Sequence, residues 1–170
     1  MLTIGDTLPA FSLLAVDIDT PAHADAAPAF RHLNQDSFPG QWKVLFCWPR
    51  EPASLCPTEI KLYGELVEAL AQRNSVLLGV SIASAFEQLA ERHEQGLKFA
   101  WLADAKGELC DALGIVQADS GEALRALFIV DPDNRLRHVS VNDPAVGRNP
   151  QETLRILDAL QSVELWSHSD

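Results

Sequence analysis

The sequence is poor in cysteine. Its 170 residues include three cysteines, at positions 47, 56 and 110. Small secreted folds that depend on disulfide bonds carry more cysteines, and usually an even number, so this class of protein is excluded. Cysteines that stay reduced fit a reducing compartment, and we expect the protein to be cytoplasmic.

Positive charge is also scarce. Lys and Arg number 13 against 24 Asp and Glu, which gives a formal net charge of −11. Nucleic acids and anionic membrane surfaces repel a protein of this charge. The composition therefore argues against nucleic acid and membrane as partners.

Segments that cross or target membranes are missing from the sequence pattern. No apolar run approaches the ~20 residues that span a bilayer. The segment Met1–Val16 contains no Lys or Arg and is interrupted by Pro9, whereas a signal peptide has a basic start and an apolar centre. We therefore expect a protein that is neither secreted nor inserted in a membrane.

What the sequence does contain is typical of one globular domain. The hydrophobic share of 47% and the charged share of 22% are ordinary for a soluble protein, so we assign 1–170 to a single domain. Apolar runs between breaking residues predict strands, and apolar residues spaced by three and four predict helices. The expected strands are 42–48, 75–82, 99–102, 124–130 and 136–141, and the expected helices are 57–74, 83–94, 106–113 and 150–160.

The order of these elements predicts the fold class. Strands alternate with helices before a hairpin and a closing helix, which is typical of an α/β fold with a central mixed β-sheet flanked by helices. A thioredoxin-like topology fits this order. We expect residues 17–41 to form a long connection with one short strand.

Cys56 occupies the most informative position. The segment after Pro49 joins the expected strand 42–48 to the expected helix 57–74, and α/β folds place chemistry in such connections. Pro57 suits the first position of a helix, so Cys56 lies where unpaired N–H groups and the helix dipole favour a thiolate. Local physics leaves two interpretations open: a reactive cysteine, or a cysteine that only caps the helix.

The motif around this cysteine resembles that of the peroxiredoxins. Pro49, with Cys56 seven residues later and Pro-Thr-Glu following, is similar to their motif Pro-x-x-x-Thr-x-x-Cys-Pro. The resemblance extends over about residues 2–165 and points to the alkyl hydroperoxide reductase C branch, especially its actinobacterial form. The other matching segments are Ile4-Gly5-Asp6 with Pro9 and Phe11, Gly79–Ile82 with Ser84 and Phe86, Phe128–Pro132, Val146–Asn149 and Leu157–Gln161.

The resemblance implies a reaction and a role for each matching residue. The Cys56 thiolate would attack a peroxide oxygen, which gives a sulfenic acid and releases water or an alcohol. Arg125 matches the arginine that stabilises the thiolate and polarises the peroxide, although without the resemblance we would interpret it as a solvated charge. Pro49 matches the proline that shields the cysteine, while Glu59 and Arg148 match charged residues networked around the site. The resemblance implies no metal and no organic cofactor, and it implies homodimers or rings built from them.

Two positions depart from the family pattern. Ala53 stands where the motif has a threonine whose hydroxyl bridges thiolate and peroxide, and losing a comparable hydrogen bond can cost roughly 10²- to 10³-fold in rate. Ser54 could replace that hydroxyl only if the loop slipped by one residue. Trp166 stands about where the branch carries its C-terminal resolving cysteine, so an external thiol would have to reduce the sulfenic acid.

The other two cysteines are best explained by core packing. Cys47 lies in the apolar run 42–48, and Cys110 lies on the apolar stripe of the expected helix 106–113. Some relatives carry resolving cysteines on helices, so Cys110, and less strongly Cys47, remains a candidate to resolve the sulfenic acid. Neither the spacing from Cys47 to Cys56 nor the spacing from Cys56 to Cys110 is typical of metal ligands.

The sequence therefore predicts a thiol peroxidase that reduces hydrogen peroxide or alkyl hydroperoxides in a one-cysteine cycle, with reduced activity. The alternative is a catalytically impaired peroxiredoxin scaffold that acts as a redox sensor or interaction protein, which Ala53 and Trp166 favour. A thioredoxin-type disulfide reductase is disfavoured because no Cys-x-x-Cys occurs.

Overall fold

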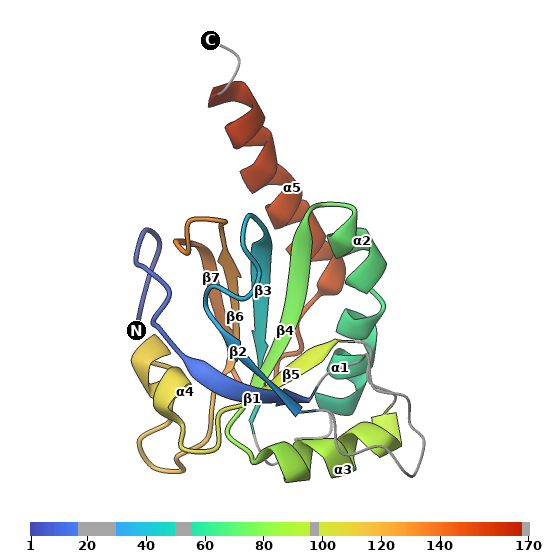
Figure 1. Ribbon diagram of the computed structural model, residues 1–170, viewed down its shortest axis with the longest axis vertical. Helices are drawn as coiled ribbons and strands as arrows, with labels where there is room; N and C mark the ends of the chain where they lie inside the picture. Colours follow the sequence, from blue (N-terminus) through green and yellow to red (C-terminus); the bar gives the residue numbers. More distant parts are fainter. Residues whose placement is uncertain (17–29, 50–55, 96–98, 168–170) are drawn as a thin grey trace.

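A seven-stranded mixed sheet forms the centre of the protein. The computed structural model describes residues 1–16, 30–49, 56–95 and 99–167, with only the backbone at 56, 92–95 and 164–167. The strand order is β2-β1-β5-β4-β3-β6-β7 (Figure 1). The strands are β1 (Ser12–Val16), β2 (Phe30–Asn34), β3 (Trp42–Cys47), β4 (Ser75–Ser81), β5 (Ala100–Ala103), β6 (Arg125–Val130) and β7 (Leu136–Asn142). The helices are α1 (Cys56–Gly64), α2 (Val67–Ala71), α3 (Ala85–Gln95), α4 (Glu108–Leu113) and α5 (Pro150–Ser167).

Parallel and antiparallel pairs meet in this sheet. β3 pairs in parallel with β4, and β4 with β5, because a helix crosses over between the members of each pair. The remaining neighbours, including the hairpin of β6 and β7, are antiparallel. The predicted α/β class, the central mixed sheet and the closing hairpin are therefore confirmed.

Side chains alternate along the interior strand β3 and contribute to two cores. Every residue of β3, Lys43 included, is buried, as the nearly continuous apolar run predicts for a strand covered on both faces. Val44 and Phe46 belong to the core beneath α1, α2 and α5, whereas Leu45 and Cys47 belong to the core that includes α4. The result is a layered structure with helices on both sides of the sheet (Figure 1).

Two of the expected helices differ from the observed ones by more than two residues. The single helix expected at 57–74 is two helices, because α1 ends at Gly64 and α2 begins at Val67. Glycine weakens a helix, and the next turn tightens where the Leu66 N–H bonds the Tyr63 carbonyl at 3.0 Å. The last helix continues to Ser167, well beyond the expected end at 160, because no Gly or Pro follows to stop it. Its C-terminal part extends beyond the sheet (Figure 1).

The loose segment 17–41 contains the expected short strand. This strand is β2, which pairs antiparallel with β1 at one edge of the sheet. Residues 35–41 are irregular, as expected, whereas residues 17–29 lie outside the described ranges, so that part of the expected long connection is not tested.

The antiparallel pairing of β3 and β6 places two distant segments side by side. Phe46 near the end of β3 lies opposite Leu127, so Arg125 at the start of β6 lies near the point where β3 ends. Trp48 follows β3 and packs over Gly79 of β4, where an added Cβ would lie only 2.6 Å from the indole ring. This end of β3 leads toward α1.

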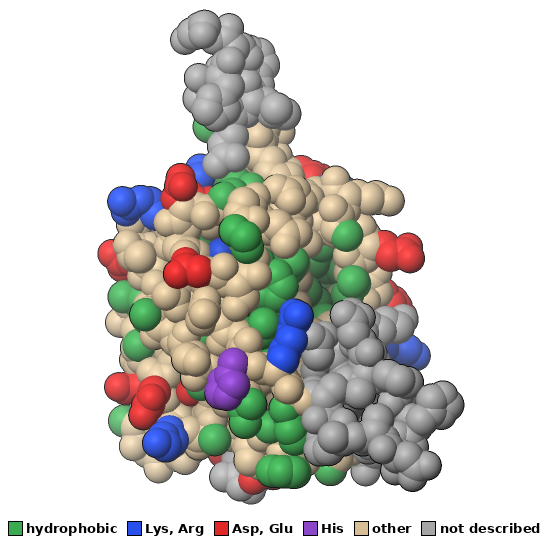
Figure 2. Space-filling model, viewed as in Figure 1, with side chains coloured by type: hydrophobic (Ala, Val, Ile, Leu, Met, Phe, Trp, Pro, Cys, Tyr) green, Lys and Arg blue, Asp and Glu red, His purple; other side chains and the backbone are tan. Residues whose placement is uncertain are grey.

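Basic side chains are dispersed over the face shown in Figure 2. Those of the described residues do not gather into one patch there. No helix within the described ranges has the length and apolar character needed to cross a membrane.

Candidate active site

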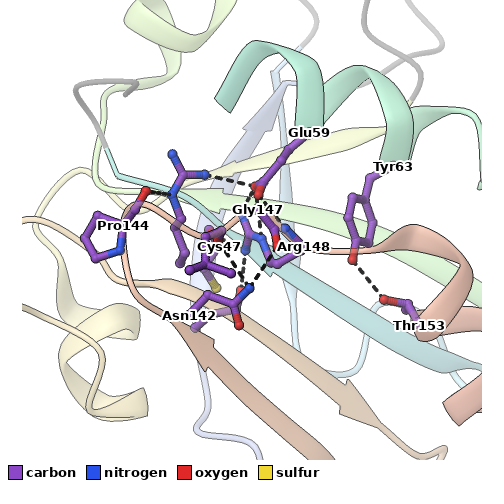
Figure 3. A network of polar contacts seen from close by, with 11 residues as sticks. Cys47, Glu59, Tyr63, Asn142, Pro144, Gly147, Arg148 and Thr153 are labelled. Atoms are coloured by element: carbon purple, nitrogen blue, oxygen red, sulfur yellow. Dashed lines mark hydrogen bonds and ion pairs between the residues drawn. The ribbon is translucent and has the colours of Figure 1, made fainter. Parts of the chain in front are cut away.

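A buried carboxylate between two arginines forms the centre of the candidate site. Glu59 Oε2 lies 3.0 Å from Nη1 of Arg125 and 2.7 Å from Nη2 of Arg148. The three residues are only 4%, 1% and 8% exposed, in the order Glu59, Arg125, Arg148. Figure 3 shows Glu59 and Arg148 facing each other within this network. The structure thus brings together three of the residues that the sequence singles out.

These three residues come from separate parts of the chain. Glu59 is in the first turn of α1, Arg125 begins β6, and Arg148 precedes α5. Asn149 caps the start of α5, since its Oδ1 accepts a hydrogen bond from the backbone N–H of Gln151 at 3.0 Å. The site therefore exists only when α1, β6 and the start of α5 pack together.

Arg148 also ties the network to the sheet. Its Nη1 donates hydrogen bonds to the carbonyl oxygens of Cys47 and Ala126, the latter at 2.8 Å. Its guanidinium carbon lies 3.8 Å from the centroid of the Phe46 ring, within the range of a cation–π interaction. These contacts are directional and planar, which suits arginine and not lysine. Arg148 therefore joins the ends of β3 and β6 to α1.

The loop between β7 and α5 closes the other side of the network. Arg125 Nε donates to the Pro144 carbonyl at 3.0 Å, and the backbone N–H of Arg148 donates to Glu59 Oε1 at 2.8 Å. Asn142 holds this loop by donating from Nδ2 to the carbonyls of residues 146 and 147, each at 3.2 Å (Figure 3). A Cβ on Gly147 would lie 3.4 Å from Glu59 Oε1, so the loop passes close to the carboxylate.

The network carries a net positive charge at the start of a helix. Two guanidinium groups and one carboxylate sum to +1. Glu59 is three residues after Cys56, the first residue of α1, which corresponds to a rise of about 4.5 Å along the helix. The positive end of the helix dipole lies there as well. This end of α1 therefore favours a negative charge.

The remaining predicted site residues lie at or beyond the edge of the described chain. Pro49 follows Trp48 and is half-buried. Cys56 begins α1, as the sequence predicts for a cysteine at a helix start, but its side chain lies outside the described part. Ala53 and the side chain of Trp166 also lie outside it, so their predicted roles remain predictions.

Cys47 and Cys110 are both core residues. Each is 0% exposed and neither forms a disulfide. Burial raises the pKa of the Cys47 thiol to about 12, despite the opposing effect of Arg148. Burial, the nearby Cys47 and Asp104 all raise the pKa of the Cys110 thiol. In this conformation neither cysteine supplies a thiolate at neutral pH, so resolution by Cys110 would require the core to open.

The structure also shows a contact that the sequence pattern does not reveal. Tyr63 Oη and Thr153 Oγ1 lie 2.9 Å apart in the interior, and this pair joins α1 to α5 (Figure 3). The spacing of apolar residues explains why the Tyr63 ring is buried, but it gives no partner for the hydroxyl. The one sequence feature that points to this contact is the position of Tyr63 four residues after Glu59, on the same side of α1.

The described residues do not provide a cluster of metal-ligating side chains. No group of three or more His, Cys, Asp or Glu among them is placed to hold a metal ion. His138 is half-buried, and burial lowers the pKa of its imidazole.

Comparison with known proteins identifies the family. The family model described as AhpC/TSA matches residues 4–139. The chain belongs to the AhpC/TSA family. This AhpC/TSA protein is 41% identical to alkyl hydroperoxide reductase C of Mycobacterium tuberculosis, in an alignment that covers 100% of this chain and 92% of that relative. It is 38% identical to the mitochondrial thioredoxin-dependent peroxide reductase of Homo sapiens, over 79% of this chain and 56% of that relative.

The solved structures agree with the family assignment. Mycobacterium tuberculosis AhpC matches this AhpC/TSA protein with a TM-score of 0.86 and 42% identity, over 97% of this chain and 96% of the other. The predicted thioredoxin-like fold and the predicted resemblance to peroxiredoxins are therefore confirmed.

Replacing Glu59 with glutamine tests the ion network. The Glu59→Gln variant leaves two buried guanidinium groups without their carboxylate, and breaking a buried ion pair typically costs about 3–5 kcal/mol. We expect urea denaturation to show a loss of unfolding free energy of this size. Glu152→Gln is the matched control, because Glu152 pairs with Arg155 on the exposed surface of α5 and its loss should not move the midpoint. Equal midpoints for the two variants would contradict the central role of Glu59.

Alkylation of the native protein tests the burial of Cys47 and Cys110. With a thiol pKa of about 12, Cys47 has a thiolate fraction of only about 10⁻⁴ near pH 8. Iodoacetamide at this pH should therefore leave Cys47 and Cys110 unmodified while the fold is intact, and should modify both in urea. Peptide mass spectrometry distinguishes the three cysteines. Modification of Cys110 at equal rates in the native and unfolded protein would show that the core is open.

Proposed function

We propose that this protein is a thiol-dependent peroxidase of the alkyl hydroperoxide reductase C type, which reduces hydrogen peroxide or alkyl hydroperoxides with Cys56. The observation that carries the proposal is the buried Arg125–Glu59–Arg148 network at the start of the helix that Cys56 begins. Membership of the AhpC/TSA family and the names of its relatives support the same activity.

The proposed reaction is a two-electron oxidation of the Cys56 sulfur. The thiolate attacks one peroxide oxygen, an S–O bond forms and the O–O bond breaks. The sulfur becomes a sulfenic acid, and the leaving oxygen takes up a proton to depart as water or an alcohol. Negative charge moves from sulfur to the leaving oxygen. A fixed positive charge nearby therefore stabilises the thiolate and also the charge that develops on the leaving oxygen.

The two arginines contribute to this chemistry in different ways. Arg148 donates hydrogen bonds to Glu59 and to two backbone carbonyls, so its role is to hold the network and supply charge. We assign to Arg125 the role of stabilising the thiolate and polarising the peroxide, as the family resemblance implies. Glu59 orients both guanidinium groups, and Pro49 shields the cysteine.

The reducing half of the cycle is proposed to use an external thiol. Trp166 stands where the branch has its C-terminal resolving cysteine, and the buried Cys47 and Cys110 have raised pKa values. One donor thiolate would attack the sulfenic sulfur, so that an S–S bond forms, the S–O bond breaks and the hydroxyl takes up a proton to leave as water. A second would release Cys56 and leave the donor as a disulfide.

Ala53 is proposed to make this peroxidase slow. The threonine of the family motif offers a hydroxyl to the reacting atoms, and alanine cannot. The competing proposal, an impaired scaffold that acts as a redox sensor or interaction protein, rests on the same residue. The two differ in how fast Cys56 reacts with peroxide.

We further propose a cytoplasmic homodimer, or a ring of such dimers. The reducing compartment rests on the small, odd number of cysteines, which does not suit a disulfide framework. The proposed assembly rests on the family resemblance.

A single-turnover experiment tests the proposed activity. Reduced protein is mixed with hydrogen peroxide without added thiol, and sulfenic acid at Cys56 is followed by trapping and mass spectrometry. We expect oxidation much faster than that of free cysteine, abolished by Cys56→Ser, and about 10²-fold faster again in Ala53→Thr. The sulfenic acid should persist until an external thiol is added. Oxidation of the wild type no faster than free cysteine would favour the scaffold proposal.

A further inference from the structure

A second contact joins α1 to α5 one helical turn beyond the ion network. Tyr63 Oη and Thr153 Oγ1 are 2.9 Å apart, and their residues are only 1% and 4% exposed. Burial raises the pKa of the Tyr63 phenol, so the hydroxyl stays protonated and able to take part in the hydrogen bond. Neither residue belongs to the ion network of Glu59, Arg125 and Arg148.

The two contacts connect α1 at two points to the segment that runs from Arg148 into α5. Glu59 and Tyr63 are four residues apart and lie on one side of α1, about 6 Å apart along its axis. Their partners are Arg148, just before α5, and Thr153, in the first turns of α5. Ile60 and the Tyr63 ring pack α1 into the core, and the hydrogen bond to Thr153 adds a second polar contact, so the direction of α1 relative to α5 is set at two points.

An aromatic contact links Tyr63 to the network by a separate route. The rings of Tyr63 and Phe46 have centroids 4.3 Å apart with an angle of 32° between their planes. The Phe46 ring also contacts the guanidinium of Arg148, at 3.8 Å. A shift of the Tyr63 ring would therefore disturb the surface on which Arg148 lies.

We propose that Tyr63 and Thr153 are positioning residues, whose hydrogen bond sets the direction of α1 and thereby the place of Cys56 relative to Arg125 and Arg148. This inference deepens the proposed function and rests on it. Tyr63 lies two turns along α1 from Cys56, so it acts through the helix and not by touching the reacting atoms.

The positioning role makes a different prediction from a merely stabilising one. A buried hydrogen bond stabilises a fold wherever it occurs, so a loss of stability alone would say nothing about position. A positioning role requires the reactivity of Cys56 to change as well. The pH dependence of Cys56 alkylation reports this, because it measures the thiolate and its surroundings.

The test compares variants that remove or retain the hydroxyl groups. Tyr63→Phe and Thr153→Val remove one hydroxyl each and keep the size of the side chain, whereas Thr153→Ser retains the hydroxyl. We expect the first two to slow peroxide oxidation of Cys56 about tenfold, since small displacements of a reacting group have large effects on rate. We also expect both to shift the pH profile of iodoacetamide labelling at Cys56 upward. Thr153→Ser should stay within about twofold of the wild type, and the double variant should be no slower than either single variant.

Ser162→Ala is the matched control. Ser162 is also on α5 and donates its hydroxyl to the Asp158 carbonyl at 2.7 Å, but it is exposed and this contact stays within α5. Its removal should leave both the rate and the pH profile unchanged.

The outcomes separate this proposal from the proposed function. If Tyr63→Phe and Thr153→Val lower the melting temperature but leave the labelling profile and oxidation rate of Cys56 unchanged, the positioning role is overturned. If the wild type reacts with peroxide no faster than free cysteine, yet both variants shift the labelling profile, the peroxidase proposal fails and the positioning role stands.

Discussion

The site depends on one carboxylate held between two guanidinium groups in the interior. Charges are costly to bury, and the Glu59 carboxylate offsets that cost for both Arg125 and Arg148. The three residues belong to α1, β6 and the segment before α5, so the ion network also determines how these elements meet. Arg148 extends the network to the carbonyls at the ends of β3 and β6. Removing Glu59 would leave two buried positive charges without their carboxylate.

The network leaves one positive charge at the start of α1, although the whole chain carries a net charge of −11. Local placement therefore matters more than overall charge for the chemistry of Cys56, because screening weakens the effect of distant charges. The environment of the other two thiols has the opposite effect and disfavours the thiolate. Cys47 and Cys110 are buried in the core, where their pKa values are raised. Three cysteines thus divide into one at a helix start and two in the interior.

The sequence predicts the structure correctly where a local pattern is compatible with only one kind of secondary structure. The apolar run 42–48 predicts a strand buried on both faces, and Pro57 predicts a helix that starts beside Cys56; the structure confirms both. The grouping of Arg125 with Arg148 came from the family resemblance, since nothing local marks either residue. The break after Gly64 involves a local turn in which the Leu66 N–H bonds the Tyr63 carbonyl, whereas the hydrogen bond between Tyr63 and Thr153 joins elements distant in sequence. Patterns of apolar spacing cannot show such contacts, because they record which side chains are buried and not which polar groups meet.

The most direct test of the account is the ionisation of Cys56 itself. Thiolate absorbance is measured against pH in the wild type, with Cys56→Ser as the reference that removes the signal of the other groups. A free cysteine is half-ionised at a pKa of about 8.5. If the positive charge of the ion network and the helix start act on Cys56, its pKa should lie well below that value and rise when Arg125 is replaced by glutamine. A Cys56 pKa at or above about 8.5, unchanged in the Arg125→Gln variant, would contradict the account.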